Sequence, residues 1–328
     1  MNRLFSILTG MLILFLFCCR QDNLIKVSDI SDVPFVWCYY IEGASKTYMQ
    51  ARVVKDIFEE ITVGEDRLIE QNEFNIRLKK NNNHTADFDF FVHLDTFSFN
   101  GLVSIGTLEV YNYWADVSPL LPSMAGDSYE LDIQHPDLSP MYARQTMPHK
   151  VPIASIELLR TEPTSDFSYA TNLQVTVQDP SAMENYYQIA AINFPQRTDG
   201  SLITDGTNLN SLRPLPIWAD DPEILDAGSS SSSSTIYLAD KFFDGQEKPI
   251  NFWIEHGEPV LPDNFRIIWR CVSPEWYRFV EARRSSSTDP RFRSTLDNSL
   301  TQPYSLPFNI EGGFGLFGVA TQELYKLD

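Results

Sequence analysis

Cysteine and histidine, the residue types that most often build metal and redox sites, are scarce in this sequence. The 328 residues include four cysteines and five histidines. The histidines show neither the i, i+4 pairing nor the Cys/His spacing that is typical of a zinc site. We therefore expect no metal, no cofactor and no catalytic residues. The five histidines are His84, His93, His135, His149 and His256.

Two cysteines, Cys38 and Cys271, lie outside the N-terminal apolar stretch. Cysteines so far apart in a sequence are more often separate buried thiols than a bonded pair. We expect that arrangement here. A disulfide between them, formed in an oxidising compartment, is the alternative.

Motifs of nucleotide-binding and hydrolytic enzymes are missing, with one formal exception. Neither a G-x-S-x-G nucleophile elbow nor a P-loop occurs. Gly313, Gly315 and Gly318 spell G-x-G-x-x-G, the fingerprint of a dinucleotide-binding turn. That turn needs a following helix and an acidic residue about 20 positions on, whereas ten residues follow Gly318. We expect instead a buried strand whose apolar side chains pack into the core, with Gly315 close against aromatic rings.

Basic residues are outnumbered by acidic ones, 25 Lys and Arg against 44 Asp and Glu, which gives a net charge of −19. A surface of this sign repels nucleic acid and anionic lipid headgroups. We therefore expect no nucleic-acid partner, and we expect membrane contact to come from a lipid. Two acidic pairs, Asp87/Asp89 and Asp220/Asp221, keep a carboxylate-dependent hydrolase as an alternative, because a glycosidase needs two carboxyl groups at the right separation.

A long apolar run occurs at the N-terminus, from Leu4 to Phe17, after the basic Arg3. The run is too short to span a bilayer comfortably and is typical of a signal peptide. It ends in Leu16-Phe17-Cys18-Cys19, which resembles a bacterial lipobox, with the bulky Phe17 as a departure. We expect residues 1–18 to be cleaved and Cys19 to carry the lipid, palmitate included. An ordinary secretory signal or an uncleaved anchor is the alternative.

Lipid attachment at Cys19 has two consequences for the mature chain. Removal of residues 1–18 removes one positive charge, Arg3, and takes the net charge from −19 to −20. Several acyl chains on one cysteine give durable membrane attachment, since each buried methylene adds about 0.8 kcal/mol. The polar residues 19–33 are expected to form a tether between the lipid and the first folded domain.

The composition favours short strands and turns, with 20 prolines, 15 glycines and many β-branched and aromatic residues. Apolar and polar residues alternate in runs such as 74–78 and 88–94, which is typical of strands with one solvated face. The stretch from Pro148 to Pro152 interrupts this pattern and is the expected domain boundary. We therefore predict a mainly β protein with two Ig-like β-sandwich domains, residues 34–147 and 148–328.

Three segments depart from this alternating pattern. Residues 48–61 suit a strand or a helix, and we expect strand and loop. Residues 193–235 form a long loop whose serine run, 229–234, is expected to be mobile. A helix is predicted over 273–285, with Ser273 as its N-cap. Its apolar face should cover one end or edge of the second sandwich.

Four phrases in the C-terminal half carry a family resemblance. Their order and spacing resemble those of the Bacteroidetes lipoprotein family catalogued as domain of unknown function 4249, from Pro148 to Ala320, whereas residues 34–147 match more loosely. The resemblance implies an outer-membrane lipoprotein, on the cell surface or the periplasmic face, that hands a ligand to a TonB-dependent transporter or caps it. The phrases are Asp179-Pro180 with Asn185-Tyr186-Tyr187, Asp240 to Gln246, Val272 to Tyr277, and Pro307 to Gly318.

The residue types in these phrases favour structural roles. Asp244-Gly245 is a turn pair that can join strands. Asn185 is expected to cap or hydrogen-bond the start of a strand, and Asp179-Pro180 to begin a turn. None of the phrases concentrates a nucleophile, a base and an oxyanion donor.

We therefore expect a non-catalytic, lipid-anchored cell-envelope protein that is a ligand-binding or accessory partner of a TonB-dependent outer-membrane transporter. The alternatives are a structural or adhesive surface module, a common use of Ig-like sandwiches, and the carboxylate-dependent hydrolase. The sequence names no ligand and no binding residue. Loops at the sandwich ends, the region between the domains and the segment 193–235 are the expected places for a ligand, because rigid scaffolds present function on loops.

Overall fold

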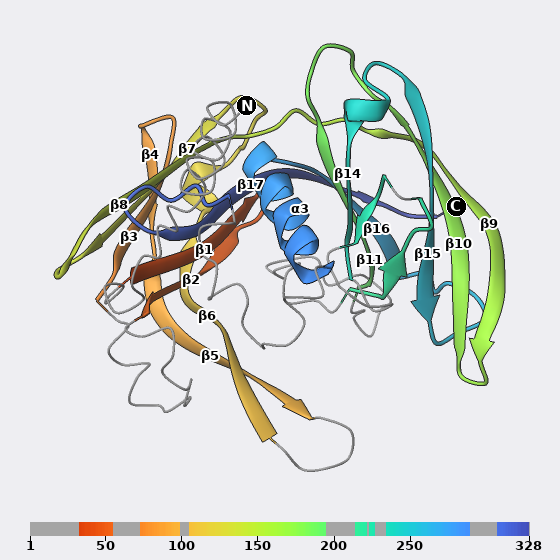
Figure 1. Cartoon of the computed structure of the whole chain (residues 1–328), viewed down its shortest axis with the longest axis horizontal. Helices are drawn as coiled ribbons and strands as arrows, with labels where there is room; N and C mark the ends of the chain where they lie inside the picture. The colour runs from red at the N-terminus through yellow and green to blue at the C-terminus, as the bar shows by residue number, and fades with distance from the viewer. Residues whose placement is uncertain are drawn as a thin grey trace, which may run out of the picture.

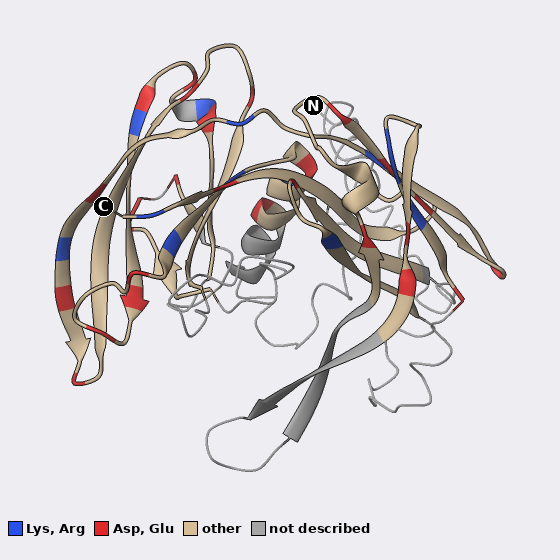
Figure 2. Ribbon diagram, turned by 180° about the vertical axis from the view of Figure 1, so that it is seen from behind, with Lys and Arg blue, Asp and Glu red and all other residues tan. Residues whose placement is uncertain are grey.

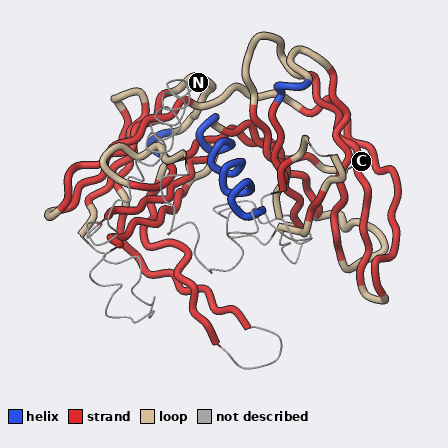
Figure 3. Tube along the Cα trace, in the orientation of Figure 1, coloured by secondary structure: helices blue, strands red, loops and turns tan. Residues whose placement is uncertain are grey.

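The computed structural model describes residues 33–54, 73–98, 105–194, 214–221, 223–226, 234–288 and 307–327. Strands dominate this part of the chain, and α3 (Pro274–Thr288) is the single α-helix in it (Figure 3). The prediction of a mainly β protein with one helix in its C-terminal half is therefore confirmed.

One nine-stranded sheet runs through both halves of the molecule (Figure 1). Its strands lie in the order β13-β14-β11-β16-β17-β1-β2-β6-β5. Strands on the β14 side of β17 come from the C-terminal half of the chain, and those on the β1 side come from the N-terminal half. In sheet order the strands are Leu225–Asp226, Ile236–Ala239, Tyr186–Asn193, Phe265–Val272, Phe314–Tyr325, Val33–Ile41, Lys46–Val54, Ile105–Asp116 and Asp89–Ser98.

Two four-stranded sheets complete the architecture, one in each half. The N-terminal one has the order β4-β3-β7-β8, with bounds His84–Asp87, Asn75–Lys80, Ser128–His135 and Leu138–Thr146. The C-terminal one has the order β12-β15-β10-β9, with bounds Ile217–Trp218, Glu247–His256, Ser168–Gln178 and Ile153–Ser165. Two 3-10 turns, η2 (Ser118–Leu120) and η3 (Asp240–Phe242), lie in connections.

Each four-stranded sheet packs on its own part of the large sheet. In the N-terminal half, Val36 and Cys38 of β1 share a core with Leu78 of β3 and Leu131 of β7, and all four are fully buried. Because side chains of a strand point alternately to its two faces, every second residue of these strands reaches this core. The alternating runs in the sequence are therefore the inner faces of two packed layers.

The C-terminal half has its own core, built in the same way. Leu173 of β10 and Phe252 of β15 pack with Ile189 of β11 and Trp269 of β16, and each is buried. The indole Nε1 of Trp269 donates to the Val151 carbonyl at 2.6 Å, which fastens the incoming end of β9 to this core.

The strand β17 belongs to both cores. It pairs in parallel with β1, from Phe35↔Phe314 to Ile41↔Ala320, and antiparallel with β16 through its second half. Phe317 and Val319 lie in the N-terminal core, whereas Tyr325 packs against the C-terminal one. The boundaries 34–147 and 148–328 stay a prediction, and the structure adds that a strand from the second segment completes the core of the first.

The helix α3 lies on the other face of the nine-stranded sheet, where the two halves join. Trp276, Tyr277 and Phe279 are buried there together with Leu316 and Ala320 of β17. The predicted helix and its apolar face are therefore confirmed. Its expected position at an end or edge of the second sandwich is wrong, because the helix covers the central strand β17.

The run 88–94, predicted as one strand, changes sheets at Phe88. β4 ends at Asp87 in a four-stranded sheet and β5 begins at Asp89 in the nine-stranded sheet. Phe88 is buried between them, and its N–H donates to the Ile76 carbonyl at 3.0 Å. Asp87 and Asp89 therefore belong to strands of two different sheets.

The predictions for residues 48–61 and for the loop 193–235 can be compared with the structure only in part, and the prediction for the two cysteines can be compared in full. The strand interpretation of 48–61 is confirmed as far as Val54, and the rest lies outside the described residues. The loop 193–235 contains two short strands, β12 and β13, and most of its serine run lies outside the described residues. Cys38 and Cys271 are both buried free thiols, as expected. Burial raises the pKa of Cys271 to about 12.

Gly315 and Gly318 show why β17 is rich in glycine. Gly315 has φ +122°, and a Cβ there would overlap the carbonyl oxygen of Val36 on β1. The expected contact of Gly315 with aromatic rings is therefore wrong, because its neighbour is backbone. The aromatic contact belongs to Gly318, where a Cβ would lie 3.0 Å from ring atoms of Trp276 and Tyr39.

Gly315→Val should destabilise the protein strongly. The variant combines a disfavoured positive φ with overlap against the backbone of β1, and we expect a loss of about 3 kcal/mol or more in the free energy of unfolding. Urea unfolding measures it. Gly257→Ala is the control, because a Cβ at Gly257 meets no heavy atom within 4 Å. Equal unfolding midpoints for wild type and Gly315→Val would contradict the close approach of β17 to β1.

Candidate functional site

The family phrases of the C-terminal half meet at two places, and the first is a group of loops beside η3. The connection from β10 to β11, which holds Asp179 and Asn185, lies against the connection from β14 to β15, which holds Asp240 and Asp244. In Figure 1, η3 is the short teal helix at the upper end of the C-terminal half. Two stretches about 60 residues apart in sequence are thus joined by short-range contacts.

Asp179 is the centre of this loop group. Its carboxylate accepts hydrogen bonds from the Tyr187 hydroxyl and from Nδ2 of Asn185, the latter at 3.3 Å. Its other oxygen accepts the Gly245 N–H at 3.1 Å. The side chain is 2% exposed. A buried carboxylate that accepts three hydrogen bonds organises its surroundings, since it holds three donors from different parts of the chain in place.

The other two acids in the group act in a similar way. Asp240 is buried and accepts the backbone N–H of Asn185 at 2.6 Å, while its own N–H donates to the Asn185 carbonyl at 3.1 Å. Asp244 accepts the N–H of Ala182 at 2.9 Å. Gly245 has φ +72°, which confirms the predicted turn at Asp244-Gly245. Asn185 therefore does hold the start of a strand, β11, as predicted.

Charge makes this loop group chemically distinctive. Oxygen atoms of Asp179, Asp240 and Asp244 all lie within 4.8 Å of one another. Burial raises the pKa of Asp240, and the neighbouring Asp179 and Asp244 raise it further, whereas its hydrogen bonds to Asn185 lower it. Carboxylate oxygens are the ligands that Ca²⁺ and Mg²⁺ prefer. Among the described residues of this half, these three form the group that could hold a hard cation, although their carboxylates already accept five hydrogen bonds.

The second meeting place is the start of α3 on β17. The Ser273 N–H donates to the Val319 carbonyl at 2.9 Å, and its hydroxyl accepts the Val319 N–H at 3.4 Å. The Asn309 side chain brackets Phe317, donating to its carbonyl at 2.7 Å and accepting its N–H at 2.8 Å. In both phrases a side chain therefore forms hydrogen bonds with backbone groups of β17, as the backbone of a neighbouring strand would.

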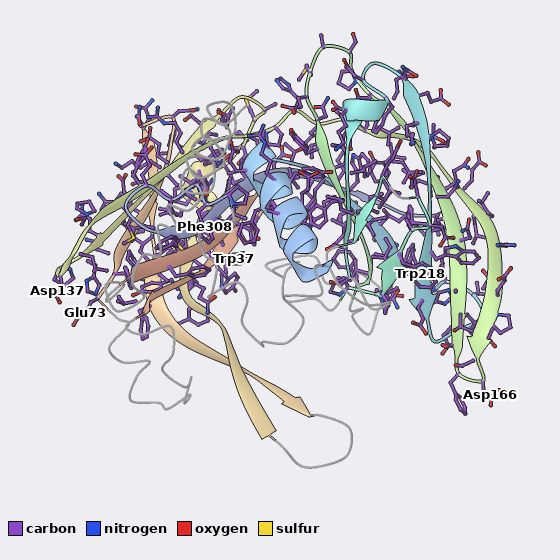
Figure 4. The ribbon with its side chains drawn as sticks, in the orientation of Figure 1. Trp37, Glu73, Asp137, Asp166, Trp218 and Phe308 are labelled. Carbon is purple, nitrogen blue, oxygen red and sulfur yellow. The ribbon has the colours of Figure 1, made fainter. Side chains whose placement is uncertain are left out.

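Aromatic side chains fill the space between α3 and β1. Tyr39 stacks on Trp276 with ring centroids 4.1 Å apart, and Trp37 meets Phe279 edge to face at 5.0 Å. Phe308 adds a further contact to Phe279 at 6.1 Å. Figure 4 places Trp37 and Phe308 beside the helix. This cluster is core in character, as the sequence predicted for the helix face.

One histidine acquires acidic neighbours that its sequence position did not suggest. His135, Glu73 and Asp137 bring ligand-type atoms within 4.8 Å of one another at the tip of the N-terminal half (Figure 4). His135 Nε2 lies 3.4 Å from a Glu73 oxygen, and Nδ1 accepts the Asp137 N–H at 3.2 Å. The ring is therefore held by a carboxylate on one side and a backbone N–H on the other.

In each acidic pair that kept a hydrolase as an alternative, one member forms an ion pair with a basic residue. Asp87 forms an ion pair with Arg77 at 2.5 Å on the surface. Asp221 lies 3.7 Å from Lys248, whose ammonium also meets Glu223 at 2.9 Å. Figure 2 shows acidic and basic residues interspersed along strands of both halves. Asp87 and Asp221 therefore belong to ion pairs at the surface.

The predicted lipid site cannot be placed in the fold. Cys19, the cleavable segment 1–18 and most of the tether 19–33 lie outside the described residues. Among the residues that the structure describes, no helix has both the length and the apolar character needed to cross a membrane.

Comparison with known proteins gives one strong match. The family model described as "Domain of unknown function (DUF4249)" matches residues 68–325. No curated protein matches significantly. A solved structure, "Crystal structure of collagen adhesin (CNA) from S. aureus", shares 6% identity over 90% of this chain and 94% of that chain, with a TM-score of 0.16. A score this low carries no statement about fold or function.

The raised pKa of Asp240 makes a pH-dependent prediction. Between the ordinary aspartate pKa and the raised one, the folded state binds more protons than the unfolded state, so this carboxyl lowers stability as pH rises. Asp240→Asn keeps an acceptor for Asn185 and removes that effect. We expect the variant to gain stability relative to wild type between pH 4 and pH 7, measured by urea unfolding.

Asp166→Asn, at the exposed tip of the β9–β10 hairpin (Figure 4), controls for the loss of one negative charge. An Asp240→Asn variant whose stability relative to wild type were the same at both pH values would show that burial does not control this carboxyl.

Proposed function

We propose, from the premise that this chain belongs to the family described as domain of unknown function 4249, that it is a non-catalytic, lipid-anchored protein of the bacterial outer membrane. In this proposal it is a ligand-binding or accessory partner of a TonB-dependent transporter. The ligand is a small molecule, and no cofactor takes part.

The observation that carries the location is the N-terminal sequence. An apolar run after Arg3 ends in Leu16-Phe17-Cys18-Cys19, which resembles a lipoprotein signal apart from the bulky Phe17. The acidic chain would gain little from anionic lipid headgroups, so attachment through Cys19 supplies the membrane contact. The polar residues 19–33 then give the folded part its distance from the bilayer.

The contacts of the family phrases support an accessory role over a catalytic one. Asp179, Asn185 and Asp240 fasten two loops, and Ser273 and Asn309 fasten β17. Because these residues hold the scaffold together, we place recognition of a ligand or partner on the loops that connect its strands. A two-core scaffold that presents connections between its strands suits a protein that contacts a transporter and its ligand.

Cys19→Ser should abolish lipid attachment. We expect the variant to lose incorporation of labelled palmitate and to leave the outer-membrane fraction, because its sulfur is the acylation site. Cys18→Ser is the matched control and should stay labelled and membrane-bound. Labelling that survived in Cys19→Ser but disappeared in Cys18→Ser would move the lipid to the other cysteine, and labelling in neither wild type nor control would refute the anchor.

The transporter partnership is tested by a pull-down of the natively anchored protein from detergent-solubilised outer membranes. We expect a TonB-dependent transporter among the captured proteins, identified by mass spectrometry, in wild type and absent from a mock purification. Consistent absence of any such transporter, together with altered cell attachment and unchanged uptake in a deletion strain, would favour the structural or adhesive module.

A further inference from the structure

A row of polar side chains crosses four strands of the nine-stranded sheet, on the face that carries α3. Tyr237 of β14 lies opposite Gln188 of β11, Gln188 lies opposite Arg270 of β16, and Arg270 lies opposite Gln322 of β17. Directly opposed residues of antiparallel strands share a sheet face. The sequence gives no sign of this row, because its members are spread over 135 residues and none stands in a recognisable motif.

The four side chains are joined by hydrogen bonds in register order. Gln188 Nε2 donates to the Tyr237 hydroxyl at 2.5 Å. Arg270 Nη1 donates to Gln188 Oε1 and Nε donates to Gln322 Oε1, both at 2.8 Å. The guanidinium is therefore held in one orientation from both sides. Neither of its partners carries a charge.

Arg270 is thus a buried cation without a counter-ion. The residue is 5% exposed, and in the described part of the chain no carboxylate lies within ion-pair distance of it. Burial lowers the pKa of Arg270 to about 10, the direction expected when the charged form is desolvated. Buried charges in proteins are normally paired, because an unpaired one destabilises the fold.

The guanidinium also has unused donors. Arginine carries five N–H groups, and the hydrogen bonds to Gln188 and Gln322 use two of them. The third guanidinium nitrogen, Nη2, has no hydrogen-bond partner among the residues that the structure describes. A planar fork of N–H donors fits a carboxylate or phosphate group, which can accept two parallel hydrogen bonds.

A purely structural role explains the row less well. Alignment of the four strands needs only neutral side chains, and Gln188 and Gln322 would pair as well with an amide at position 270. Replacement of a buried charge by an apolar residue is often neutral or stabilising. The charge at Arg270 is therefore the feature that calls for a binding partner.

We propose that Arg270, held by Gln188 and Gln322, binds the oxyanion head, a carboxylate or a phosphate, of a small ligand. The net charge of −19 disfavours anions at the general surface, so a pre-oriented, shielded cation is what a selective anion site on this protein requires. The inference deepens the ligand-binding role proposed above and rests on it for its biological meaning. Its chemistry is tested without a transporter, so the two proposals can fail separately.

The test is thermal unfolding of the protein purified from its native membrane fraction or, if no lipid is attached, from the soluble fraction, in the same detergent at constant ionic strength. Sodium chloride is replaced in separate arms by sodium benzoate, sodium acetate or inorganic phosphate, and benzamide serves as the neutral analogue of benzoate. We expect a carboxylate arm or the phosphate arm to raise the melting temperature above chloride and benzamide. The arm that does so identifies the head group.

Arg270→Met should lose this response, and titration should show an apparent affinity weaker by about tenfold or more. Arg266→Met is the matched control, because Arg266 lies on the same strand and donates to the backbone carbonyls of Asp263 and Phe265. The control should respond as wild type does. Without any anion, Arg270→Met should melt at or above the wild-type temperature.

Three outcomes would overturn the proposal: no anion arm raises the wild-type melting temperature, Arg270→Met responds as wild type does, or Arg266→Met loses the response equally. If Arg270→Met fails to fold, Arg270→Lys decides, since it keeps the charge and removes the fork. An unchanged affinity in Arg270→Lys would also overturn it, whereas a loss of about tenfold supports the bidentate contact.

Discussion

The pairing of β17 with β1 on one side and β16 on the other is the interaction on which the rest of the structure depends. It joins strands from both halves into one sheet and contributes apolar side chains to two separate cores. A parallel strand pair requires a long crossover, and here nearly the whole chain is that crossover. Without β17, β1 would present an unpaired edge and the N-terminal core would lack Phe317 and Val319.

Many residues of the family phrases stabilise the position of β17 in the sheet. Gly315 lets the backbone of β17 approach β1, Gly318 makes room for the stacked rings of Tyr39 and Trp276, and Ser273 and Asn309 supply hydrogen bonds along the strand. Asp179 and its neighbours fix the start of β11, two strands away. The shared sequence features thus describe a scaffold, which is why they identify the family without naming a ligand.

Local patterns in the sequence predicted many of the strands and the helix, because burial on one face imposes a period of two or of 3.6 residues. They could not predict which strands pair. The neighbours β1 and β17 are separated by more than 270 residues, and no local signal encodes their register. The prediction of one strand over 88–94 was wrong for a related reason. The buried Phe88 continues the alternating pattern at the point where the chain passes from one sheet to another.

The candidate sites were hidden by the same limit. Asp179 and Asp240 stood in recognised phrases, so their importance was foreseeable, but their contact was not. Arg270 had no signal of its own, because an arginine in an apolar strand becomes unusual only when its neighbours across the sheet are known to be neutral.

The shared strand also sets an order of events during folding. The N-terminal core needs residues 317 and 319, so it cannot close until nearly the entire chain has been synthesised. Contacts of such large sequence separation slow folding, because a long loop must close before they form. The two cores therefore reach their final packing only after β17 has joined the sheet.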